Sequence, residues 1–452
     1  MGVKEAPLIS GNMTDQADLT ALALRERLSS GALSAVELVT NCLQRIKARE
    51  ASIQAWTCVD EEVALIQARM LDGYRRTGRP LGPLHGLPVG IKDIIDTHDL
   101  PTENGNAVDS GRQPTEDAWL VARLRAAGAI IPGKTVTTEC AYLAPAKTSN
   151  PHNLEHTPGG SSSGSAAAVA SGMVPFAVGT QTGGSVIRPA SFCGIVGFKP
   201  SFGMIPRSGV LRTSRQLDTV GTFGRTIEDA ALLADVLAGH DLADPDTMPM
   251  AQPRLLETTL TNPPVTPQLA FVKSPAWSDI EPDCAEGFAE LVDVLGEHCD
   301  AFELPGIFNE GVKAHRCIML TEMAHNLRHY YDRGADRLAA ETCAAIEEGR
   351  TISAVDYLAS MAWRDTLYAG LEAVFDRYDA VITPAAPGEA PIGHSSTGSA
   401  AFNVLWSLTG VPAITLPLLT GRRGLPVGVQ LIGRRNDDAR LLRTARWLTG
   451  QI

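Results

Sequence analysis

Apolar side chains recur at helical spacing near the beginning of the chain. Residues 34–37 form a capping-box sequence, in which a serine and a glutamate close the first turn of a helix. The apolar residues that follow are three and four positions apart, which predicts an amphipathic helix: Val36, Val39, Leu43 and Ile46. A second helix is predicted over about residues 60–75, so we expect the N-terminal stretch to be helical.

Short apolar runs predict strands farther along. Residues 87–95 have the pattern of a buried strand that carries one lysine, Lys92. Residues 129–131 and 174–178 predict two more strands, and residues 117–127 predict a helix. The last of these strands lies inside a segment without charged residues.

This segment has no charged residue between Glu155 and Arg188. Its prolines, glycines and serines exclude a single membrane-spanning helix. The pattern instead predicts a loop over residues 157–163, a tightly packed helix over 164–171, and a glycine-rich turn over 180–185 that opens another helix. A buried, water-poor catalytic centre fits this composition.

The second half changes character twice. Prolines gather between residues 243 and 268, which predicts a linker or surface excursion, and residues 281–379 are mostly helical in pattern. Strands are then predicted at the positions 380–383, 413–416 and 427–432, before a closing helix at 437–448. Strands near both ends predict an α/β fold in which distant parts of the chain complete one sheet.

Composition limits the function classes. The 452 residues carry a net charge of −12, which argues against nucleic acid as the main partner, and 44% apolar with 20% charged residues is ordinary for a globular protein. Residues 1–16 contain no apolar run typical of a secretory signal. The eight cysteines include no C-x-x-C pair, which predicts free thiols in a reducing compartment. We expect a cytoplasmic protein without a membrane partner.

Residues 128–135 satisfy the G-x-x-x-x-G-K-[ST] pattern of a phosphate-binding P-loop. A P-loop follows a strand and opens a helix, whereas this segment follows a predicted helix and contains a predicted strand. Pro132 also removes a backbone N–H that a phosphate would need. The context therefore argues against a nucleotide site.

Residues 160–164 satisfy G-x-S-x-G, the nucleophile elbow of α/β-hydrolases, with Ser162 at its centre. An elbow needs a buried strand directly before it, and residues 153–158 lack that pattern. The aspartate and histidine of such a triad also have no recognisable setting downstream. The elbow is the weaker interpretation of this loop.

His325 and His329 are four residues apart, with Glu322 one turn earlier. Zinc sites use that spacing, but the glutamate of H-E-x-x-H is absent and Arg328 lies beside the pair. We interpret the histidines as a polar helix face and expect neither a metal nor another cofactor.

A fourth pattern combines three features. A charged Lys92 would be costly to bury among apolar neighbours, and burial lowers the pKa of a lysine below its usual value of about 10.4, so that the neutral amine acts as a base. The serines of residues 161–163 are candidate proton relays. The two glycines before Ser185 let backbone N–H groups converge, as an oxyanion hole requires. Each feature alone has a plain structural explanation, but together they favour a nucleophilic serine with a lysine base.

These segments resemble the amidase signature family, whose members hydrolyse amides with a Ser-cisSer-Lys triad. The resemblance is dense over about residues 80–235 and weak over 240–400. Its longest runs are residues 82–93 (GPLHGLPVGIKD), 158–168 (PGGSSSGSAAA), 179–185 (GTQTGGS), 410–417 (GVPAITLP) and 424–433 (GLPVGVQLIG).

The resemblance implies one α/β amidase domain over residues 1–452, with a large mixed sheet and helices on both faces. Its expected parts are an N-terminal helical segment to about residue 78, the signature core over 80–235, a variable, mostly helical region over 240–400, and C-terminal strands and a helix over 401–452.

The resemblance also implies residue roles. Ser185 resembles the nucleophile, Ser161 resembles the serine that follows a cis peptide bond, and Lys92 resembles the base. Together with the amide of the nucleophile itself, the expected oxyanion hole consists of the backbone amides of Thr182, Gly183 and Gly184.

The chain departs from the usual family run G-[TS]-D-T-G-G-S-I-R. Gln181 stands where the family has an aspartate, and Arg188 falls three residues after the serine instead of two. The loop at 159–164 also reads GGSSSG instead of GGSSGG. These variants resemble the malonamidase branch, whose arginine at this place holds a substrate carboxylate. We therefore expect Arg188 and Gln181 to bind a small, carboxylate-bearing amide.

Two alternatives stay open. Biuret-pathway hydrolases act on carboxylated ureides and are similar at these positions. The amidotransferase subunit that serves glutaminyl-tRNA formation shares the triad, but it needs partner subunits and usually keeps the aspartate that is Gln181 here. The expected partner is a small amide substrate, and a homodimer remains open.

Overall fold

The computed structural model describes residues 19–249, 251 and 253–452, so the expectation about a signal in residues 1–16 lies outside the described residues. The N-terminal part is helical, as predicted, with one short strand between its second and third helices. Its elements are α1 (Ala21–Ser30), α2 (Ala35–Ile53), β1 (Trp56–Val59) and α3 (Glu61–Arg75). The predicted capping box opens α2, because Ser34 Oγ accepts from Glu37 N and Glu37 Oε2 accepts from Ser34 N.

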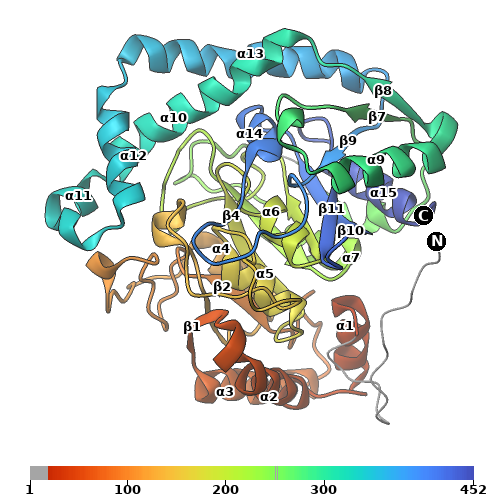
Figure 1. Cartoon of the computed structure of the whole chain (residues 1–452). Coiled ribbons are helices and arrows are strands. Elements are labelled where there is room, and N and C mark those ends of the chain that lie inside the picture. Colours follow the sequence, from red (N-terminus) through yellow and green to blue (C-terminus); the bar gives the residue numbers. More distant parts are fainter. Residues whose placement is uncertain (1–18, 250, 252) are drawn as a thin grey trace.

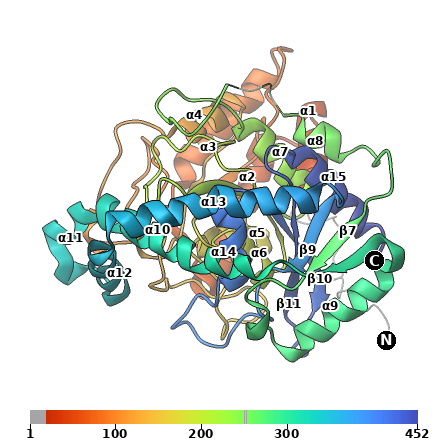
Figure 2. The ribbon, with the colours of Figure 1, turned by 90° about the horizontal axis from the view of Figure 1, so that it is seen from above.

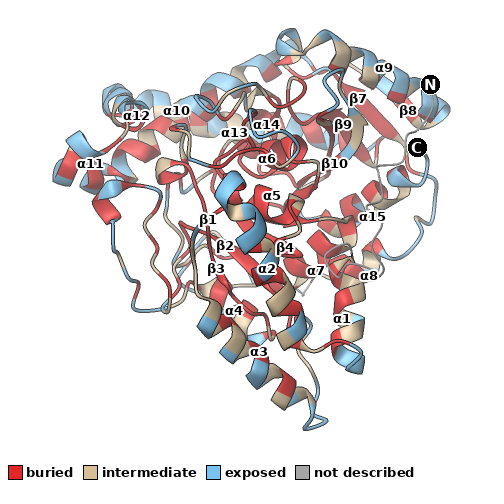
Figure 3. Cartoon of the chain, turned by 60° about the horizontal axis from the view of Figure 1, so that its bottom comes forward, coloured by how far each residue is buried: buried red, intermediate tan, exposed pale blue. Residues whose placement is uncertain are grey.

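The central part alternates strands with helices. Its elements are β2 (Val89–Lys92), α4 (Trp119–Ala126), β3 (Gly133–Thr135), α5 (Ser163–Ala170), β4 (Phe176–Gln181), α6 (Ile187–Phe192), β5 (Val196–Lys199), β6 (Thr219–Gly224) and α7 (Ile227–Leu237). The uncharged segment is almost wholly buried here, and α5 and α6 lie in the middle of the molecule (Figure 3).

The second half begins with a short helix inside the proline-rich segment and continues with long helices. Its elements are α8 (Leu255–Thr259), β7 (Leu269–Val272), α9 (Pro282–Leu295), β8 (Cys299–Phe302), α10 (Glu310–Asn326), α11 (Arg328–Gly334), α12 (Ala340–Thr351), α13 (Ala354–Phe375), β9 (Ala380–Pro384), α14 (Ala401–Leu408), β10 (Ala413–Thr420), β11 (Pro426–Ile432) and α15 (Asp438–Thr449).

Within the described residues, one sheet of eleven strands joins both halves in the order β1-β3-β2-β4-β6-β5-β10-β11-β9-β7-β8. The sheet is mixed: β3, β2 and β4 run parallel, the next strands are antiparallel, and β9, β7 and β8 are parallel again. Distant segments meet at its centre, where β5 pairs with β10. The predicted α/β fold with one mixed sheet is confirmed.

Helices lie around this sheet, with α2 and α3 at one end of the molecule and α10, α12 and α13 at the other (Figure 1). Seen from above, α10 and α13 cross the molecule beside α14 (Figure 2). No helix in the described ranges is long and apolar enough to cross a membrane. All eight cysteines are free thiols, as predicted.

Several predicted strand bounds were wrong. The strand predicted at 87–95 ends at Lys92, because Ile94 and Ile95 turn back and donate their N–H groups to the Lys92 carbonyl. The strand predicted at 129–131 lies instead at Gly133–Thr135, with only an isolated bridge at Ile130. The helical stretch 281–379 also contains the edge strand β8.

Candidate active site

Lys92 is the last residue of β2, which lies between β3 and β4 in the sheet. Its side chain is fully buried, and its Nζ donates to Ser161 Oγ at 2.8 Å and to Thr180 Oγ1 at 2.9 Å. Two of the three predicted triad residues are therefore in direct contact, although the serine lies on a loop far along the chain.

Burial lowers the pKa of Lys92 to about 7, while the nearby Asp218 carboxylate acts in the opposite direction. The pKa of Asp218 is itself raised to about 6 by its own burial. A lysine with a pKa near neutrality has a large neutral fraction at physiological pH, so its lone pair is available to a proton from Ser161.

The loop before α5 presents Ser161. The peptide bond between Gly160 and Ser161 is cis, as the resemblance implies, and the Ser161 carbonyl accepts from the backbone N–H of Thr138 at 3.1 Å. Ser162 Oγ, by contrast, donates to the Thr180 carbonyl at 3.2 Å. The residue that an elbow would use as nucleophile thus ties the loop to β4.

Ser185 lies in the turn between β4 and α6, buried with 9% of its surface exposed. Its hydroxyl makes no hydrogen bond with another residue in the described part of the chain. Gln181 supports the turn from inside, because its Oε1 accepts from the backbone N–H groups of Val186 and Ile187 at 2.9 and 3.0 Å. The other end of the Gln181 amide donates to Ser407 Oγ at 3.0 Å.

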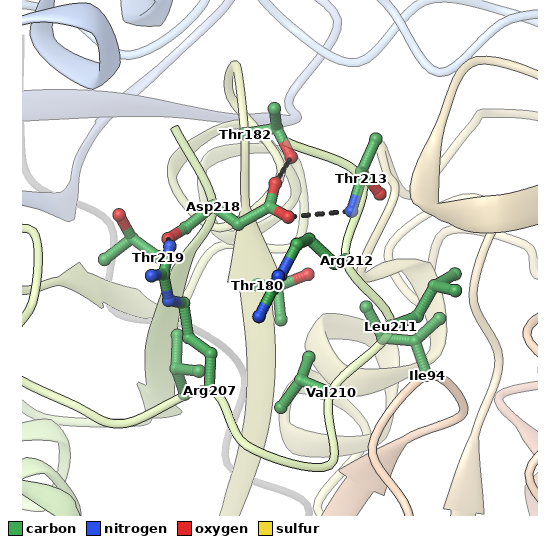
Figure 4. A pocket seen from close by; sticks show the side chains of 11 residues that line it. Ile94, Thr180, Thr182, Arg207, Val210, Leu211, Arg212, Thr213, Asp218 and Thr219 are labelled. Atoms are coloured by element: carbon green, nitrogen blue, oxygen red, sulfur yellow. Dashed lines mark hydrogen bonds between the residues drawn. The ribbon is translucent and has the colours of Figure 1, made fainter. Parts of the chain in front are cut away.

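Asp218 anchors the same turn from the opposite side. Thr182 Oγ1 donates to one carboxylate oxygen at 2.6 Å, and the other oxygen accepts from the backbone N–H groups of Thr213 and Ser214 at 2.8 Å each. A small cavity with both apolar and polar lining residues lies beside this carboxylate and reaches Thr180, the second hydrogen-bond partner of Lys92 (Figure 4). Asp218 therefore links the turn expected to form the oxyanion hole with the predicted base: it accepts a hydrogen bond from Thr182 and its charge acts on Lys92.

Arg188 is the second residue of α6, and its side chain is buried. Its Nη2 donates to the Gly160 carbonyl at 2.6 Å and to Thr397 Oγ1 at 3.1 Å. Its Nε and Nη1 are buried and have no hydrogen-bond partner within the described ranges, where no carboxylate forms an ion pair with this guanidinium either. Burial alone lowers the pKa of Arg188 to about 10. The guanidinium remains a cation with unused donors one peptide away from Ser161.

The competing motifs have other roles. Lys134 of the P-loop pattern is buried in β3, and its Nζ donates to Ile95 O at 2.7 Å and to Thr102 Oγ1, which ties the loop after β2 to the sheet. The two histidines that we interpreted as one polar helix face are divided, because α10 ends at Asn326 and α11 begins at Arg328, leaving His325 and His329 on different helices.

Sequence reasoning missed several residues that shape the site. Thr180 belongs to the conspicuous glycine-rich sequence and is the second-last residue of the buried strand β4, so its hydroxyl had a local signal. Asp218 and Thr397 had no local signal, since each reaches the site from a distant loop.

Comparisons with known proteins agree with this geometry. The sequence model of the family described as Amidase matches residues 37–442. The A-type subunit of the glutamyl-tRNA(Gln) amidotransferase of Chloroflexus aggregans is 34% identical, with 95% of this chain and 96% of that protein covered. Its counterpart in Streptomyces coelicolor is 33% identical, with 95% of each covered.

Solved structures are similar over nearly the whole chain. A chain from the vestigial protein complex that reveals the evolutionary origins of an s-triazine catabolic enzyme has a TM-score of 0.90 at 26% identity, and the match covers 96% of this chain and 98% of that one. The native peptide amidase of Stenotrophomonas maltophilia has a TM-score of 0.84 at 28% identity, covering 96% and 97%. The chain therefore belongs to the amidase signature family and is an amide hydrolase.

Proposed function

We propose that the chain cleaves a small, carboxylate-bearing amide to the acid and ammonia through an acyl-enzyme on Ser185. The observation that carries this proposal is the buried contact between Lys92 Nζ and Ser161 Oγ at 2.8 Å, beside the turn that carries Ser185. A serine hydroxyl is a weak nucleophile unless a base removes its proton, and a neutral lysine serves as that base.

In the proposed reaction, Ser185 Oγ attacks the amide carbon while its proton passes through Ser161 to Lys92. The tetrahedral intermediate then loses its C–N bond, and the same proton returns through Ser161 to the leaving nitrogen, which departs as ammonia. Water attacks the resulting ester, gives its proton to the same pair, and releases the carboxylic acid as Ser185 is protonated again. No external oxidant or reductant is needed.

The backbone N–H groups of residues 182–185 are the proposed oxyanion hole. Donors that are fixed before the reaction stabilise the developing negative charge without reorganisation. The hydrogen bonds from Thr182 to Asp218 and from the α6 N-terminus to Gln181 support this role, because they fix both ends of the turn. We propose Gln181 as a positioning residue for the turn, since both ends of its amide are engaged inside the protein.

Arg188 is the proposed carboxylate site. Its buried Nε and Nη1 lack partners within the described ranges, and its Nη2 contacts Gly160 O, one peptide away from Ser161. Buried charges in proteins are normally paired, so an anionic substrate group is the expected partner. Malonamate has such a group beside its amide, as do carboxylated ureides, so both classes offer an anion to this guanidinium.

A second candidate is an A-type component of an amidotransferase. The sequence similarity to the A-type subunits of glutamyl-tRNA(Gln) amidotransferases supports this alternative more strongly than it supports the malonamidase-like one. Glutamine would then be the amide, and its α-carboxylate would be the anion for Arg188. In this case the chain would act with partner subunits.

Ammonia release by the purified chain alone distinguishes these candidates. Malonamate, a carboxylated urea, glutamine and the neutral propionamide are the substrates to compare. Turnover of either of the first two without a partner would support the hydrolase. If glutamine is the only one of the four substrates that is turned over, or if turnover needs the other subunits of an amidotransferase, the amidotransferase function would replace the proposed hydrolase function. Preference for propionamide would contradict the carboxylate site.

A further inference from the structure

Two side chains from outside the signature core hold the carbonyl groups of the turn that carries Ser185. His315 Nε2, on α10, donates to Thr182 O at 2.9 Å, and Ser407 Oγ, on α14, donates to Gly183 O at 2.6 Å. The helices α10 and α14 lie against each other beside this part of the sheet (Figure 2).

Holding a carbonyl also fixes the direction of an N–H. The C=O and N–H groups of a trans peptide point in opposite directions, and within the described residues only the bond between Gly160 and Ser161 is cis. The Thr182 carbonyl shares its peptide plane with the N–H of Gly183, and the Gly183 carbonyl shares its plane with the N–H of Gly184. His315 and Ser407 therefore aim these two N–H groups away from α10 and α14.

The two donors are themselves fixed. His315 is buried, and burial lowers its pKa to about 4, so the ring is neutral near physiological pH. Because its partner is a carbonyl, Nε2 carries the proton. Ser407 Oγ accepts from Gln181 Nε2 at 3.0 Å, which leaves the Ser407 hydrogen for Gly183 O. An aspartate at position 181 has no hydrogen to donate to Ser407.

At Gly184 the turn has no free space on the side of α14. A Cβ on Gly184 would lie 2.3 Å from Asn403 Oδ1, so α14 packs directly against the glycine. Glycines nevertheless rotate easily about their backbone bonds, and a rotated peptide would present a carbonyl where a donor is needed. A turn of this composition needs side chains that select one orientation.

We propose that His315 and Ser407 are positioning residues that orient the Gly183 and Gly184 N–H groups as an oxyanion hole, with Gln181 setting the direction of the Ser407 hydroxyl. This inference rests on the proposed function, because it takes Ser185 as the nucleophile. It extends the machinery beyond the signature motifs to α10 and α14.

The test compares His315→Phe, His315→Gln and Ser407→Ala with the matched control His152→Phe, since His152 Nε2 also lies 2.9 Å from a backbone carbonyl, that of Cys193. The assays are steady-state hydrolysis of malonamate and inhibition by 2-carboxyethylboronic acid, whose boron forms a tetrahedral adduct with a serine. Removal of a direct oxyanion donor costs about 10²–10³ in kcat, so loss of an orienting group should lower kcat by about 10–100-fold.

We expect His315→Phe and Ser407→Ala to lower kcat by that factor with KM within about twofold, and to weaken boronate binding in parallel with kcat/KM. His315→Gln should recover most of the rate, because its amide also donates, and the control should stay close to the wild type. Unchanged kcat and inhibition constant in both variants would overturn the proposal, as would a loss of kcat without weaker boronate binding. Retained turnover in Ser185→Ala would instead defeat the proposed function itself.

Discussion

Lys92 Nζ donates to Ser161 Oγ at 2.8 Å in an environment where the lysine has no exposed surface. The proposed base and the proposed relay are thus joined in the free protein. The same burial that lowers the pKa of the amine also removes the water that would otherwise compete for its lone pair. Thr180, the second partner of Nζ, holds the amine beside β4.

The first prediction concerns the triad itself. Ser185→Ala and Lys92→Ala should each abolish amide turnover, because one removes the nucleophile and the other removes the base, and Ser161→Ala should reduce it severely. Circular dichroism and thermal unfolding should show that each variant folds. Near-wild-type rates for Lys92→Ala at neutral pH would contradict the triad.

The second prediction identifies the nucleophile chemically. A fluorophosphonate should label Ser185, and peptide mass spectrometry should locate the adduct there. Ser162→Ala is the matched control, because its hydroxyl is held by the Thr180 carbonyl and it should leave labelling at Ser185 intact. Stable labelling of Ser162 in the wild type would favour the nucleophile elbow.

The third prediction is a pH dependence. The base must be neutral to accept a proton, so kcat/KM should rise about tenfold per pH unit below the pKa of Lys92 and level off above about 7. The Asp218 carboxylate raises that pKa, so Asp218→Asn should move the rising limb to lower pH. Measuring kcat/KM between pH 5 and about 9 for the wild type and for Asp218→Asn tests the direction of this shift. A limb that moves to higher pH would be inconsistent with a neutral Lys92 as base.

The fourth prediction concerns stability. The pKa of Lys92 is lowered on folding from 10.5 to about 7, so the unfolded chain binds more protons between these values and stability rises with pH there. Replacing the amine removes this penalty, which is on the order of 5 kcal/mol below pH 7, but it also loses about 1–3 kcal/mol from the hydrogen bonds to Ser161 and Thr180.

Lys92→Met should therefore be inactive but more stable than the wild type at pH 6, and the gain should fade as pH approaches 10. Urea unfolding at both pH values measures it. Lys134→Met offers a comparison at a second buried lysine. The Lys134 amine donates to backbone carbonyls of the loop after β2, and its replacement should leave those carbonyls without this hydrogen-bond donor. If the Lys92→Met protein is less stable than the wild type at pH 6, the hydrogen bonds of the amine stabilise the fold by more than its burial costs, and the prediction is wrong.

Sequence pattern predicted the elements that have a local cause. The capping box at Ser34 and Glu37 opens α2, and the uncharged segment forms a buried centre. The strand at 129–131 was misplaced because the apolar residues there pack as a connection, while the short run Gly133–Thr135 pairs with β1 and β2. Such a strand is selected by its neighbours in the sheet, which are remote in sequence, so no local pattern could place it.

The same distinction applies to the site. Lys92, Ser161 and Ser185 stand in long, specific motifs, and the structure brings the first two into contact. Thr397 and Ser407 could not be predicted, because each belongs to the weakly matching or unremarkable part of the chain and reaches the site only through the tertiary fold. Each contacts the site through individual side-chain hydrogen bonds, and such contacts produce no periodic pattern in the sequence.

The last prediction tests the carboxylate site. Arg188→Ala should damage malonamate hydrolysis far more than hydrolysis of propionamide, because the buried Nε and Nη1 have no partner within the described ranges and the neutral amide has no anion to offer them. Loss of one partner of a buried charge pair costs roughly 2–5 kcal/mol, which corresponds to about 30- to several-thousand-fold in kcat/KM. Arg188→Lys should recover little, since an ammonium lacks the planar set of donors. Thr397→Val is the control, because it removes one partner of Nη2 and leaves the charge in place. Equal losses on the acidic and the neutral amide would make Arg188 a structural residue, held by Gly160 and Thr397 alone.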